Sequence, residues 1–100
     1  MVNNQNVSAI PNQMNRIDTI LKENTPEQAM VLLSKIIAEN PQDAAALFAR
    51  GKLYWKEGNR AKATSDYAAA AAIDPDSPAV MALEQAREIE NFFNPDLLNP

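Results

Sequence analysis

Hydrophobic residues along this chain recur mainly at spacings of three and four, which places them on one face of an α-helix. Over residues 12–23 the apolar positions are Met14, Ile17, Ile20 and Leu21, and residues 25–39 show the same pattern. Gly occurs only twice, whereas residues that favour helix are abundant. No stretch of useful length alternates apolar and polar residues as a strand would. The pattern predicts an all-α protein of about five helices.

Capping residues and prolines predict where these helices begin and end. Counted with their caps, the predicted helices cover residues 12–23, 25–39, 43–58, 59–73 and 77–91. Thr25 and Gln28 have the spacing of a capping box, and Pro26 suits the first turn that follows. Gly58 fits a left-handed helix end. The helices are therefore joined by short turns, as in antiparallel hairpins.

The chain contains an internal repeat with a period of 34 residues. A shift by this length aligns Ala29 with Ala63 and Pro41 with Pro75, and it also aligns apolar positions between them. A helix pair of this length cannot bury its apolar face alone, so successive pairs are expected to stack on one another.

Residues 44–77 resemble a tetratricopeptide repeat. The signature positions are Leu47, Arg50, Gly51, Tyr54, Ala63, Tyr67, Ala70 and Pro75. The resemblance implies a short right-handed solenoid in which Gly51 and Ala63 let two helices approach closely while Tyr54 and Tyr67 fill the seam. Leu47 stands where the family favours Trp, and Arg50 where it favours Leu. We expect these two departures to weaken the packing without changing the fold.

The repeat divides the chain into a central domain and two flanking segments. We predict a degenerate repeat over residues 10–43, a clear repeat over 44–77 and a capping helix over 78–91, with Arg87, Glu88 and Glu90 facing solvent. Residues 1–9 are polar and are expected to be disordered, and 92–100 form an apolar extended tail. Two repeats fall below the roughly three usually needed for a stable stack, so the capping helix, the tail, a dimer or a larger parent chain must support them.

The composition argues against several classes of function. The chain has 9 Lys and Arg against 13 Asp and Glu, a net charge of -4, which disfavours nucleic acid as a partner. It has neither Cys nor His, the commonest zinc ligands, and no motif of an enzyme or cofactor site. We therefore predict no catalytic, metal-binding or cofactor-binding residues. Asp18 and Asp66 are interpreted as solvated surface carboxylates.

The longest nearly apolar run, residues 68–73, is far shorter than the roughly 20 residues that cross a bilayer, so we expect no membrane insertion. The first ten residues lack the cationic and apolar regions of a secretory leader. The expected location is the cytoplasm.

The resemblance implies that a protein or peptide binds the concave face lined by the first helix of each pair. On the third helix that face carries Phe48, Lys52, Trp55 and Lys56, our candidate partner-binding residues. Aromatic side chains are enriched at interface hot spots, and Lys can pair with a carboxylate. Two simpler interpretations stay open: Trp55 packs on the first or fifth helix, and the two Lys form a solvated face.

Two further possibilities concern the partner. The basic clamp that some members of the family use for acidic chaperone tails is not predicted, because its positions hold Met14, Asp18, Ala49, Ala79 and Leu83. The alternative to an adaptor, scaffold or assembly factor is a homo-oligomeric structural domain. Its tail would pack in its own groove or a partner's, with a homodimer formed through Phe92, Phe93, Leu97 and Leu98.

Overall fold

A computed structural model describes residues 12–92, with the surroundings of side chains from 16 to 89. The helices are α2 (Asn12–Glu23), α3 (Pro26–Glu39), α4 (Ala44–Lys56), α5 (Arg60–Ile73) and α6 (Ala79–Phe92). This part of the chain contains no strand, which confirms the prediction of an all-α protein with five helices. The segment 1–9 and the tail beyond Phe92 lie outside the described residues, and the limits of the individual repeats stay a prediction.

The helix starts are capped as the sequence predicts. Thr25 and Gln28 form a reciprocal capping box, with both hydrogen bonds 3.1 Å long. Asp43 Oδ1 accepts a 3.0 Å hydrogen bond from the Ala46 amide, and its other carboxylate oxygen lies 3.5 Å from Arg16 of α2. These contacts satisfy amides that a helix leaves without an internal partner, and the Asp43 contacts also connect α2 to the start of α4.

The turn between α4 and α5 is short because each helix ends or begins with a residue suited to it. Gly58 has a positive φ of 86°, the left-handed conformation that glycine adopts without strain. Asn59 then caps α5 by accepting a 3.2 Å hydrogen bond from the Lys62 amide. Ser77 does the same for α6, with its Oγ 3.0 Å from the Ala79 amide. Successive helices therefore reverse direction within a few residues.

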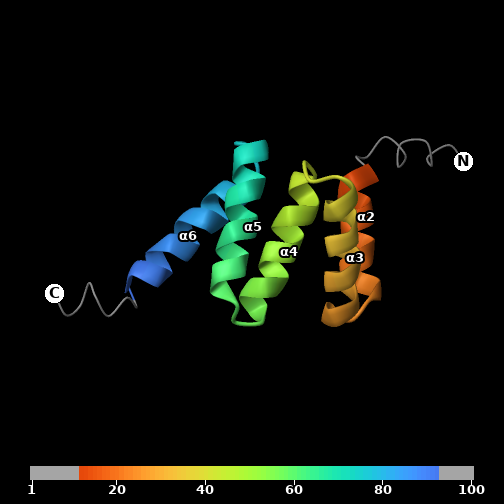
Figure 1. Ribbon diagram of the computed structural model, residues 1–100, viewed down its shortest axis with the longest axis horizontal. Helices are drawn as coiled ribbons and strands as arrows, with labels where there is room; N and C mark the ends of the chain where they lie inside the picture. The colour runs from red at the N-terminus through yellow and green to blue at the C-terminus, as the bar shows by residue number, and fades with distance from the viewer. Residues whose placement is uncertain (1–11, 93–100) are drawn as a thin grey trace, which may run out of the picture.

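In Figure 1, α6, α5 and α4 lie next to one another, and α2 and α3 overlap on the other side of α4. On one side α4 packs with α2 and α3 around the fully buried Leu33. On the other side it packs with α5, and α5 in turn packs with α6. Leu47, Ala70 and Ala79 form the buried cluster shared by these three helices. The alanines of α5 thus permit close approach by α6.

The crossing of α4 and α5 depends on Gly51. A methyl group at this position would lie 2.8 Å from two carbons of the Tyr67 ring and 3.3 Å from the Ala63 carbonyl oxygen. Tyr67 is only 5% exposed, and its ring packs against Phe48 with 5.8 Å between ring centroids. Burial also raises the pKa of the Tyr67 hydroxyl, because the phenolate loses its hydration there. The ring therefore has little freedom to move away from position 51.

We expect Gly51→Ala to lower the free energy of unfolding by about 1–2 kcal/mol, because overpacking at the crossing outweighs the roughly 1 kcal/mol by which Ala favours helix. Urea denaturation followed by circular dichroism measures this change. In a Tyr67→Leu background, where the ring is absent, the same substitution should be neutral or stabilising. An equal loss in both backgrounds would show that the ring does not limit the crossing.

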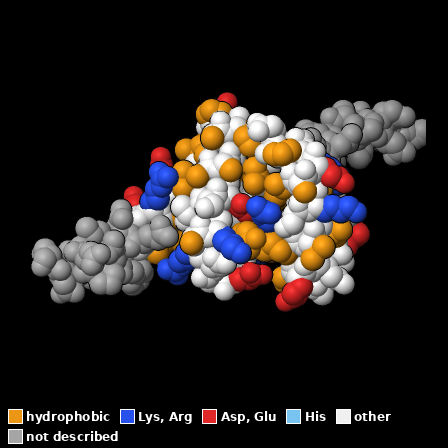
Figure 2. Space-filling view, in the orientation of Figure 1, with side chains coloured by type: hydrophobic (Ala, Val, Ile, Leu, Met, Phe, Trp, Pro, Cys, Tyr) orange, Lys and Arg blue, Asp and Glu red, His pale blue; other side chains and the backbone are white. Residues whose placement is uncertain are grey.

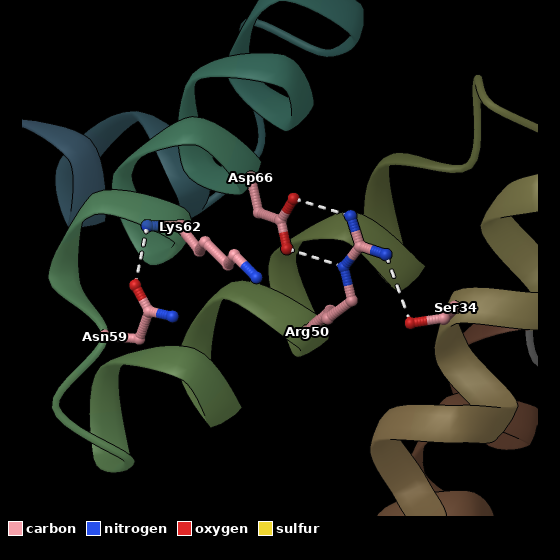
Figure 3. Close-up of polar contacts among 5 residues, drawn as sticks. All are labelled: Ser34, Arg50, Asn59, Lys62 and Asp66. Carbon is pink, nitrogen blue, oxygen red and sulfur yellow. Dashed lines mark hydrogen bonds and ion pairs between the residues drawn. The ribbon is translucent and has the colours of Figure 1, made fainter.

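The prediction that Asp66 is a solvated surface carboxylate is wrong. Asp66 is 6% exposed and accepts two hydrogen bonds from Arg50, of 2.7 Å from Nε and 2.9 Å from Nη2 (Figure 3). Arg50 Nη1 also donates a 3.2 Å hydrogen bond to Ser34 Oγ of α3. Asp18, in contrast, is exposed as predicted, and so are Arg87 and Glu88.

Arg50 therefore replaces an apolar contact by a polar link that joins α3, α4 and α5. The hydrogen bonds to Asp66 raise the pKa of the Arg50 guanidinium, while its partial burial acts in the opposite direction. The effect of Arg50 on packing stays a prediction, but its guanidinium satisfies the buried carboxylate of Asp66. The sequence contained a signal for this pair, since Arg50 and Asp66 lie on adjacent helices of one predicted hairpin.

We expect Asp66→Ala to destabilise the protein by about 2–4 kcal/mol, because it leaves the partly buried Arg50 guanidinium without its carboxylate partner. Arg50→Leu, which installs the residue that the family favours, should destabilise by leaving Asp66 unpaired. The double variant Arg50→Leu with Asp66→Ala should lose less stability than the sum of the two single variants. Chemical denaturation of all four proteins gives the coupling free energy, and additive effects would contradict a specific pair.

Candidate protein-binding site

A groove runs between α2 and α4, the first helices of the two predicted pairs. Its first part is a hollow of about 190 Å³. The lining residues are Ile17, Asp18, Leu21, Ala44, Ala45, Phe48, Ala49, Lys52, Asp74, Ser77 and Pro78. Three small alanines of α4 line this hollow, so the surface of α4 is low there between larger side chains. Apolar hollows with a few polar groups at their edges are the usual form of a binding site.

The groove continues towards the end of α4. A second hollow of about 440 Å³ shares Leu21, Ala49 and Lys52 with the first and extends to Lys56 and Glu57. The two hollows are therefore neighbouring parts of one surface along α4. Together they offer space for a short stretch of polypeptide.

Phe48 and Lys52 come together in this groove. The Lys52 ammonium lies 5.2 Å from the centroid of the Phe48 ring, a cation–π distance. Phe48 is half-buried against Tyr67, whereas Lys52 is exposed and forms no ion pair with a described residue. The contact holds a positive charge beside an apolar surface, where it can meet a ligand carboxylate.

Trp55 lies at the edge of this broad face of α4 that is turned towards α6. It lines a separate hollow of about 190 Å³ together with Tyr67, Ala82, Gln85, Ala86 and Ile89. Its half-buried indole packs on the cluster of α5 and α6, and the Arg60 guanidinium lies 4.9 Å from the ring centroid. The structure therefore divides the four candidate residues: Phe48, Lys52 and Lys56 line the groove with α2, and Trp55 faces α6.

Helical geometry explains this division. Seven residues after Phe48, Trp55 is rotated by only about 20° around α4, but Lys52 and Lys56 are rotated by about 40° and 80° in the opposite direction. The four residues therefore do share one broad face, as the sequence indicates. The spacing of residues within α4 does not reveal where α6 packs. The sequence therefore could not show that Trp55 faces α6 while the other three residues line the groove.

We expect Trp55→Ala to lower the free energy of unfolding by about 1–2 kcal/mol. Removing a half-buried indole costs less packing energy than removing a fully buried one. Lys56→Ala, one residue further on and exposed, should change stability by less than about 0.5 kcal/mol. Thermal denaturation of both variants tests this. Equal stability of Trp55→Ala and the unaltered chain would show that the indole is free for a partner.

The described residues contain no group of three or more acidic, His or Cys side chains that could hold a metal ion. None of the helices within residues 12–92 combines the length and hydrophobicity needed to cross a membrane. The cytoplasmic location stays a prediction.

The fold is that of a helical-hairpin repeat domain, in which the two helices of a pair cross at a small residue. The tetratricopeptide repeat profile matches residues 21–87, and the chain belongs to this family. Members of this family are in general protein–protein interaction modules and typically not enzymes.

One curated relative is the DnaJ homolog subfamily C member 7 homolog of Schizosaccharomyces pombe. It is 32% identical over 73 residues, which is 72% of this chain and 15% of the relative. The chain thus spans about a seventh of the length of that protein. No solved structure matches the chain significantly.

Proposed function

We propose that the chain binds a short peptide or helix of a partner protein in the groove between α2 and α4 and acts as an adaptor, scaffold or assembly factor. The observation that carries this proposal is the cation–π contact between Phe48 and Lys52, whose ammonium forms no ion pair with a described residue, beside the alanine-lined surface of α4. Trp55 contributes a second contact where a longer ligand passes from α4 to α6. Protein binding in general follows from the family.

The charges along the groove indicate how a ligand would lie in it. Asp18 and Asp74 line its first part together with Lys52, and Lys52 and Lys56 line its continuation towards the end of α4 together with Glu27 and Glu57. A segment with an apolar side chain in the first hollow and an acidic group towards Lys52 and Lys56 would satisfy this arrangement. Complementary charges of this kind set orientation and specificity more than affinity.

A clamp for acidic chaperone tails is not part of the proposal. Asp18 is exposed in the groove at one of the clamp positions, and Ala49, at another, is 4% exposed. A cation cannot be supplied from either place.

Peptides selected from a random 12-residue library should bind with contacts centred on the groove. Amide chemical-shift changes on binding should concentrate at Ala45, Phe48 and Lys52 of α4. Lys52→Glu should weaken binding roughly tenfold, because it replaces an attraction to the ligand carboxylate by repulsion. Lys35→Glu makes the same charge change at an exposed position of α3 and should leave binding unchanged. Shifts confined to α3, or equal loss with both variants, would contradict the groove as the site.

Self-association through the tail is the alternative function, and its residues Phe93, Leu97 and Leu98 lie outside the described part of the chain, as does the side chain of Phe92. Light scattering at several concentrations, before and after removal of residues 93–100, separates the two functions. A dimer that dissociates on truncation would favour self-association. A monomer in both forms would favour a different protein as the partner.

A further inference from the structure

Positive charge is concentrated in one short part of the sequence. Residues 50–62 contain five of the nine Lys and Arg but only one of the 13 acidic residues, Glu57. This segment therefore carries a charge of +4, although the whole chain carries -4. The remainder of the chain has a charge of -8, so the molecule is strongly bipolar.

The fold gathers these cations around the turn between α4 and α5. Arg50 is neutralised by Asp66. The other four, which we call the basic tip, are Lys52, Lys56, Arg60 and Lys62. All four are exposed, and none forms an ion pair with a described residue. Figure 2 shows Lys and Arg side chains over α4 and α5 towards this end of the molecule.

Aromatic rings hold three of the four cations in place. Arg60 lies 4.9 Å from the Trp55 ring centroid, Lys62 lies 5.6 Å from that of Tyr54, and Lys52 lies over Phe48. In Figure 3 the Lys62 side chain points from α5 towards α4. Cation–π contacts leave the hydrogen-bond donors of each cation free while restricting its motion, which lowers the entropy lost when a partner binds.

We propose that the basic tip is a second docking surface, which binds a short acidic segment of a protein partner. The charge distribution favours this ligand over other polyanions. A nucleic acid or an anionic membrane extends beyond the tip and would meet the remainder of the chain, whose charge is -8. A short acidic segment contacts the tip alone. The tip adjoins the groove, because Lys52 and Lys56 line the groove's hollows, and it extends beyond the groove to Arg60 and Lys62, which line neither hollow.

The test uses an amino-terminally labelled octa-glutamate peptide as the probe, with fluorescence anisotropy as the measurement at low ionic strength. Trp55 is the only Trp in the chain and lies beneath Arg60, so its fluorescence should also change on binding. The double variant Arg60→Glu with Lys62→Glu should bind the probe at least about tenfold more weakly. Added salt should weaken binding to the unaltered chain, because it screens exposed charges.

The matched control is Lys35→Glu with Arg87→Glu, which changes the net charge equally at two exposed positions, on α3 and α6. It should retain most of the binding. An equal loss with both double variants would overturn the proposal, since net charge alone would then explain it. Tighter binding of an octathymidylate or of phosphatidylserine vesicles than of octa-glutamate would also overturn it.

Circular dichroism establishes that each variant is folded. The groove-selected peptides provide an independent comparison, because Arg60→Glu with Lys62→Glu should leave their binding intact. Failure at the basic tip can therefore be distinguished from failure of the proposed groove function.

Discussion

The close crossing of α4 and α5 is the contact on which the rest of this structure depends. It exists because Gly51 has no side chain where the Tyr67 ring and the Ala63 carbonyl approach. Once α5 lies this close, its row of alanines can accept α6, and Ala70 and Ala79 become fully buried. A larger residue at position 51 would therefore disturb the packing of α6 as well as that of α5.

Polar contacts add order to a core that consists mainly of small and medium apolar residues. Arg50 connects α3 to α5 through Ser34 and Asp66, and Asp43 connects the start of α4 to α2 through Arg16. A buried ion pair contributes less to stability than to geometry, because desolvation offsets much of its attraction. These links therefore help to set how neighbouring helix pairs are placed, which in turn shapes the groove between α2 and α4.

Helix α4 contributes to both proposed binding surfaces. Phe48 and Lys52 line the groove with α2, while Lys52 and Lys56 also belong to the basic tip with the first turn of α5. Lys52 and Lys56 are common to the two surfaces, so one partner could extend from the groove to the tip. The bipolar charge of the chain would orient such a partner during encounter, because attraction at the tip and repulsion elsewhere act before close contact.

The sequence by itself determined the local structure and the family. Helix bounds followed from caps such as Thr25 and Asp43. The 34-residue period indicated stacked helix pairs, and Gly51 and Tyr67 identified the seam between the two helices of a pair. These signals could be read because they depend only on neighbouring residues or on the spacing of a repeat. Only the tertiary structure decided the surroundings of individual side chains. Asp66 is buried against Arg50 because α4 and α5 face each other there, and Trp55 is half-buried because its indole packs on the cluster of α5 and α6. Such surroundings arise from helices distant in sequence, and no spacing within one helix encodes them.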